Sequence, residues 1–201
     1  MPVLELLSPR ELHLLSLVSK ASRATCEPLL YSSIEWTWLE DRPPPITAFI
    51  RTILRRPELA AHVRSVSLLG DSFIPYHENR DTKPPRIDIA SLDYEDAVKA
   101  MELTKVDFAL LPMKLSWKDQ MSQGAMDTLT TLLLSQLHHV TNLVLGPIFT
   151  FETGLLRQLF YAAVFRQTDY ELPTYQHLRV LCLNFGAKQG RTIYSARSTD
   201  L

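Results

Sequence analysis

Three short segments of the chain share one pattern of apolar and polar positions. Each begins with His, continues with an apolar residue and two variable residues, and ends with an apolar residue, any residue and Leu; they are 62–68, 139–145 and 177–183. Such short, β-branched or Leu-rich runs predict buried strands. They begin 77 and 38 residues apart, each after a helical pattern, which favours a strand–helix solenoid with one degenerate unit in the longer interval. The alternative is three unrelated core strands of an ordinary α/β domain.

Apolar residues spaced three and four positions apart predict the helices that connect these strands. In chain order the predicted helices cover residues 46–56, 91–111, 124–137 and 153–166. In the last of them, five side chains are expected to face the core: Leu155, Leu156, Leu159, Phe160 and Val164.

The N-terminal region carries a separate helical pattern. The Ser-Pro-Arg-Glu sequence at 8–11 predicts a helix start, because it combines a capping box with proline at the first helical position. The apolar face of this helix continues to Val18, and a second short helix follows over 19–27. Pro28 is expected to end or restart that second helix. Residues 33–38 alternate between apolar and polar, which predicts a half-exposed strand.

Proline-rich and aperiodic segments divide the chain into parts. Residues 41–45 contain three consecutive prolines and predict a stiff linker between an N-terminal segment, 1–40, and a larger region, 46–185. Residues 70–90 are polar and aperiodic, which predicts a mobile insertion, and residues 186–201 predict a disordered tail. The expected fold class is therefore α/β, with a short helical segment followed by an irregular solenoid. We expect the solenoid to be incomplete at both ends, because no polar capping unit is visible.

Two parts of the chain resemble a known family. The N-terminal segment contains Leu15-Ser-Leu-Val-Ser-Lys20 and Glu27-Pro-Leu-Leu-Tyr31, and a later stretch is Leu54-Arg-Arg-Pro-Glu-Leu-Ala-Ala-His-Val-Arg-Ser-Val-Ser-Leu68. These residues are similar to the fungal F-box/leucine-rich-repeat proteins, closely over residues 6–70 and more loosely over the later repeats. The family's F-box is a bundle of three short helices, and residues 1–7 do not match its first helix. The resemblance is therefore to a truncated F-box with few repeats.

This resemblance implies a function in protein interaction. It implies a non-enzymatic substrate receptor of an SCF-type ubiquitin ligase, in which the helices dock a Skp-type adaptor of the cullin–RING ligase and the repeats hold a target protein. The alternative is a leucine-rich-repeat scaffold, or a degenerate fragment, that does not bind the adaptor. The positions that match the family motif, and on which adaptor binding is expected, are Leu12, Leu15, Leu17, Val18, Pro28 and Leu29.

Composition and charge argue against nucleic acid and membranes as partners. The formal net charge of the 201 residues is −1 and the pI is about 6.6, so we expect neither nucleic acid nor a membrane as partner. No apolar run approaches the roughly 20 residues that span a bilayer, and the first residues do not match a signal peptide. Cys26 and Cys182 are expected to be reduced thiols of an intracellular protein, cytoplasmic or nuclear.

Motifs for catalysis are missing from the sequence. It contains no GxSxG, P-loop, GxGxxG, HExxH or CxxC pattern, so we expect no enzyme, no cofactor and no metal site. The heptad histidines His62, His139 and His177 can form a ladder in a solenoid. We favour a structural role for them, in which each histidine hydrogen-bonds the turn into its strand.

Overall fold

A five-stranded sheet organises the computed structural model. The strands occur in the order β1-β2-β3-β4-β5, where β1 to β4 are parallel and β5 is antiparallel to β4. Their bounds are Ser33–Thr37, Ser65–Leu69, Asn142–Leu145, Val180–Leu183 and Thr192–Ser195. The residues that the structure describes are 4–39, 42–70, 86–104, 106, 116–149, 154–165, 175, 177–183 and 192–195.

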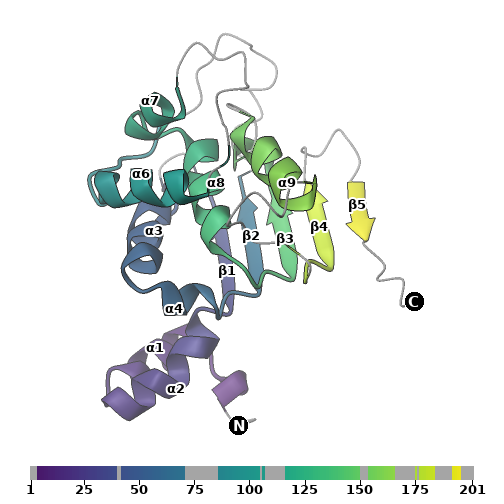
Figure 1. Ribbon diagram of the computed structural model, residues 1–201. Helices are drawn as coiled ribbons and strands as arrows, with labels where there is room; N and C mark the ends of the chain where they lie inside the picture. Colours follow the sequence, from purple (N-terminus) through teal and green to yellow (C-terminus); the bar gives the residue numbers. More distant parts are fainter. Residues whose placement is uncertain are drawn as a thin grey trace.

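Helices connect the parallel strands, as the geometry of parallel pairing requires. Between β1 and β2 lie α3 (Ile46–Arg55) and α4 (Pro57–Ala60). Between β2 and β3 lie α6 (Tyr94–Leu103), α7 (Trp117–Ser122) and α8 (Met126–Gln136). The 3-10 helix η3 (Pro147–Phe149) and α9 (Leu155–Phe165) precede β4. Figure 1 shows α3, α6, α8 and α9 on the same face of the sheet, which confirms the α/β class.

The three heptads pair in one common register. Ser65 lies opposite Asn142, and Asn142 lies opposite Val180, so equivalent heptad positions are neighbours in the sheet. The rings of His139 and His177 accordingly stack, with their centroids 5.9 Å apart. This pairing confirms the three strands that the sequence predicts, and β1 extends the parallel sheet by one strand beyond them.

The hydrophobic core lies between the sheet and α8. Ten of the eleven residues of α8 are buried, including Leu129, Leu132 and Leu134. The helix also buries threonines, and two of them are satisfied locally: the hydroxyl of Thr130 donates to the carbonyl of Met126 at 2.8 Å, and that of Thr131 donates to the carbonyl of Asp127 at 2.7 Å. Bonds of this kind satisfy polar side chains in a helix that is buried on nearly every side.

Two helices differ from their predictions. Pro28 lies inside α2 (Lys20–Leu30), so the prediction that it ends or restarts this helix was wrong. The helix continues to Leu30 without the N–H bond that Pro28 cannot donate to the carbonyl of Ala24. Val164 is 55% exposed, which contradicts its predicted inward position. The inner face of α9 uses Ala162 and Ala163 instead, which are small enough for close packing against the core.

Two segments that were predicted to lack regular structure, 70–90 and 186–201, contain ordered residues. Most of the predicted insertion, residues 71–85, lies outside the described residues. Near its end, Ile87 is buried, and its backbone N–H donates to the carbonyl of Gly124 at 3.0 Å. In the segment predicted to be a disordered tail, Thr192–Ser195 form β5; the rest of that segment is outside the described residues.

Gly124 holds this contact in a backbone conformation that favours glycine. Its φ is +68°, and an added Cβ would overlap the carbonyl oxygen of Ile87. We predict that Gly124→Ala lowers the free energy of unfolding by at least about 2 kcal/mol, because it combines left-handed strain with a backbone clash. Urea denaturation measures the change. The neighbouring exposed Gln123→Ala is the control, and an equal, small effect of both substitutions would contradict the prediction.

Candidate functional site

The candidate site is built on the N-terminal helix pair, α1 (Pro9–Ser16) and α2 (Lys20–Leu30). The predicted capping box starts α1: the backbone N–H of Glu11 donates to Ser8 Oγ at 3.3 Å, and the backbone N–H of Ser8 donates to Glu11 Oε2 at 2.7 Å. The bonds from Ser8 hold the pKa of the Glu11 carboxyl below its usual value. Ser19 caps α2 by accepting from the backbone N–H of Ser22 at 3.0 Å. The Ser8 cap therefore fixes the start of α1, and the Ser19 cap fixes the short turn between the two helices.

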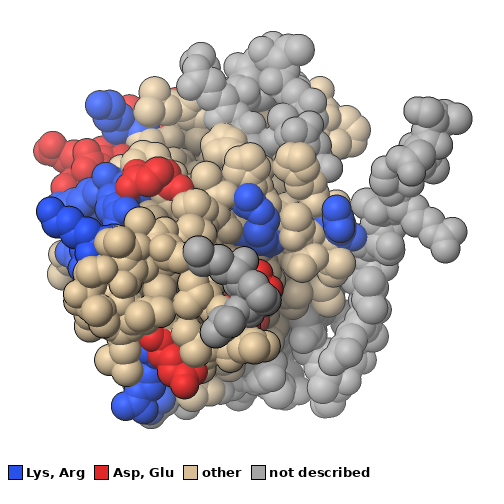
Figure 2. Space-filling view, turned by 90° about the horizontal axis from the view of Figure 1, so that it is seen from below, with Lys and Arg blue, Asp and Glu red and all other residues tan. Residues whose placement is uncertain are grey.

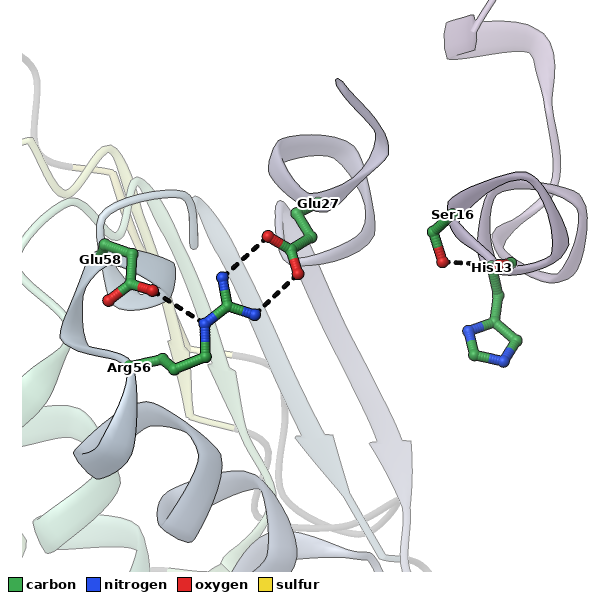
Figure 3. Close-up of polar contacts among 5 residues, drawn as sticks. All are labelled: His13, Ser16, Glu27, Arg56 and Glu58. Carbon is green, nitrogen blue, oxygen red and sulfur yellow. Dashed lines mark hydrogen bonds and ion pairs between the residues drawn. The ribbon is translucent and has the colours of Figure 1, made fainter. Parts of the chain in front are cut away.

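A small buried core holds the helix pair together. Leu12, Ser16 and Cys26 are buried, and the hydroxyl of Ser16 donates to the carbonyl of His13 at 2.6 Å (Figure 3). Burial of Cys26 agrees with its predicted role as an apolar thiol, whereas Cys182 in β4 is half-buried.

An apolar patch, Leu14, Leu17 and Val18, lies at the C-terminal end of α1. These side chains are 56%, 59% and 74% exposed. Spacings of three and four residues place them on one side of the helical turn. Figure 2 shows this end of the molecule, where a broad uncharged area lies among scattered charged side chains. Large apolar side chains that are grouped and exposed mark an interaction surface more often than isolated ones do.

The six residues suggested by the family motif fall into three groups. Leu17 and Val18 belong to the apolar patch, and Leu12 is buried between the helices. The remaining three, Leu15, Pro28 and Leu29, are half-buried. Leu14 also belongs to the patch but is not a position of the family motif. The apolar periodicity of α1 could have identified it. Leu6 of η1 (Leu4–Leu6), which is 84% exposed, is not one of the six positions.

An ion pair attaches the helix pair to the rest of the molecule. The guanidinium of Arg56, at the junction of α3 and α4, donates to both carboxylate oxygens of Glu27 at 2.7 and 2.9 Å. Its Nε also donates to Glu58 at 2.8 Å (Figure 3). The bidentate geometry orients the two groups as well as attracting them. Only two residues separate α2 from β1, so the helix pair is held to the sheet both by this short connection and by the ion pair.

The charges of this cluster reinforce one another. The hydrogen bonds from Arg56 lower the pKa of the Glu27 carboxyl, and they also lower the pKa of Glu58. The two carboxylates in turn raise the pKa of Arg56, so the guanidinium stays charged. The cluster can therefore fix the orientation of the helix pair relative to α3 and α4.

The described residues offer no other obvious chemistry. Among them, no group of three or more His, Cys, Asp or Glu side chains is placed to hold a metal ion. The helices within the same ranges are too short or too polar to cross a bilayer. The chain was compared with protein-family models, curated proteins and solved structures, and none of them matches it.

The ion pair makes a pH-dependent contribution to stability. We predict that Glu27→Gln lowers the thermal midpoint by a few degrees at neutral pH, because the charge-assisted bonds to Arg56 are weakened. The Glu27 pKa is lowered by folding, so its stabilisation is full above the unfolded-state pKa, about 4.3, and is lost as the pH falls through the folded-state value. The deficit of the variant should therefore disappear in acid.

The control is Glu102→Gln, which removes the charge from a more exposed pair, Lys118 Nζ to Glu102 Oε1 at 2.6 Å. The Glu102 side chain is 54% exposed against 17% for Glu27, so its substitution should have the smaller effect. Thermal denaturation followed by circular dichroism across pH measures both. Equal midpoints for the two variants at neutral pH would contradict a special role for the Glu27–Arg56 pair.

Proposed function

We propose that this chain is a non-enzymatic substrate receptor of the F-box/leucine-rich-repeat type, which docks a Skp-type ligase adaptor through its N-terminal helix pair. The observation that carries the proposal is the exposed apolar patch, Leu14, Leu17 and Val18, at the end of that pair. Leu17 and Val18 are also positions of the family motif. An adaptor groove that receives helical apolar side chains would bury this patch and remove its cost of exposure.

The arrangement of the sheet supports the repeat half of the proposal. Strands β1 to β4 follow their order in the sequence, and the connecting helices lie on one face, as stacked strand–helix repeats would place them. The face opposite the helices bears one residue from each strand in the row Glu35, Ser67, Val144 and Cys182. We assign this face to a target protein. The place of action that we propose is the cytoplasm or the nucleus.

A scaffold that does not bind the adaptor is the second candidate. It is favoured by the burial of Leu12 and the half-burial of Leu15, Pro28 and Leu29, which leave only two of the six motif positions well exposed. The two candidates share the repeat fold and differ in whether the apolar patch suffices for docking.

Co-purification with a Skp-type adaptor distinguishes the candidates. We predict that the full chain retains the adaptor and that the double variant Leu17→Asp, Val18→Asp reduces the affinity at least about tenfold, because it places two charges in an apolar contact. Both side chains are largely exposed, so the folded chain should tolerate the change. Affinity is measured by calorimetry with the purified adaptor.

The matched control is Leu103→Asp on α6, where the leucine is 55% exposed and lies away from the helix pair. It should leave adaptor binding unchanged. If the wild-type chain binds no adaptor, or if Leu103→Asp weakens binding as much as the double variant does, docking through the apolar patch is refuted and the scaffold remains.

A further inference from the structure

Strand β1 has a free edge on the side opposite β2. It is the first strand of the sheet, so only β2 pairs with it in the part of the chain that the structure describes. On the paired side, the backbone N–H of Trp38 donates to the carbonyl of Leu69 at 2.7 Å, and the carbonyl of Ser32 accepts from the N–H of Ser65 at 3.0 Å. Alternate residues of a strand direct their backbone groups to opposite sides. The backbone groups of the three intervening exposed residues therefore point outward; these residues are Ser33, Glu35 and Thr37.

An open groove of about 570 Å³ lies along this edge. Four consecutive residues of β1 form one wall, and one side of α3 with parts of the helix pair forms the rest. The lining is Pro9, Leu30, Ser33, Ile34, Glu35, Trp36, Pro45, Ala48, Phe49 and Thr52. Trp36 and Phe49 meet edge to face in it, with ring centroids 5.5 Å apart. The groove thus offers aromatic surface directly beside unpaired backbone donors and acceptors.

Glu35 is the charged residue of the free edge. It is the one charged side chain among the lining residues, and it is exposed in the middle of the free edge. A second copy of the chain that paired antiparallel about this position would bring two Glu35 carboxylates face to face, which is unfavourable. A partner strand with Lys or Arg at that position would instead gain an ion pair.

We propose that the β1 edge binds an extended peptide segment of a partner protein, which adds a strand to the sheet, places an apolar side chain against Trp36 and Phe49, and sets a Lys or Arg beside Glu35. Backbone pairing supplies affinity in this mode of recognition, while the groove and the carboxylate supply sequence preference. The site uses residues outside the apolar patch, so it stands whether or not the chain docks a ligase adaptor.

Selection from a phage-displayed library of random peptides on the full chain tests the proposal. We expect enriched peptides to share a Lys or Arg near an aromatic or large aliphatic residue. Copies of the best peptide carrying one backbone N-methyl group at a time should bind at least about tenfold more weakly at every second position, because only alternate amides face β1. Failure to enrich any peptide, or an N-methyl effect without alternation, would overturn the proposal.

Two variants of one residue test the protein side of the contact. Glu35→Gln removes only the charge and should weaken the best peptide a few-fold. Glu35→Pro also removes one outward N–H without breaking a bond to β2, and should weaken it by a further factor on the order of ten. Circular dichroism checks that both variants are folded; should the proline variant unfold, the N-methyl series on the wild-type chain decides. Equal binding by two folded variants would overturn the proposal.

Light scattering tests whether a second copy of the chain occupies the β1 edge instead of a peptide. We expect the chain without peptide to be a monomer at the concentrations of the binding assay. A dimer that Glu35→Pro dissociates would assign the edge to a second copy and overturn the peptide proposal.

Discussion

The common register of the four parallel strands determines the rest of the structure. Alternate side chains of a strand face opposite ways, so a slip of one residue would exchange the buried and exposed faces. In the observed register, Ile34, Val66 and Leu143 form one buried row, and the residues that precede them, Ser33, Ser65 and Asn142, form a polar row. Burial of the apolar rows requires the helices to collect on a single face, where α8 fills the centre of the core.

The sequence predicts the parts of the fold that depend on periodicity. The heptads predict the register of β2, β3 and β4, since Ser65, Asn142 and Val180 occupy the same heptad position and are neighbours in the sheet. The helix starts that have a cap, as at Ser8, follow from local hydrogen bonding. The errors arise where a local rule does not hold: α2 continues through Pro28 to Leu30, and small residues rather than Val164 form the inner face of α9.

The candidate sites are harder to obtain from the sequence than the fold. The family motif includes both Leu12 and Val18, but the pairing of α1 with α2 buries the first and exposes the second, and periodicity alone does not state which side the partner helix covers. The free edge of β1 could not be predicted from residues 33–38 either. Their alternation indicates a half-exposed strand but does not distinguish an edge strand from a central one. Glu27 and Arg56 are 29 residues apart, so no local motif could have joined them.

The attachment of the helix pair connects the two proposed surfaces. Pro9 of α1 and Leu30 of α2 line the groove beside β1, while Leu14 and Val18, farther along the same pair, carry the apolar patch. The two-residue connection from α2 to β1 and the stacking of Tyr31 on Phe49, with centroids 5.9 Å apart, restrict how the pair can turn. The bidentate contact of Arg56 with Glu27 restricts the orientation further, because a planar guanidinium can donate to both oxygens of a carboxylate in few orientations. The shape of the groove and the direction of the patch therefore depend on the same set of contacts, and a partner bound at one surface is held in a fixed relation to the other.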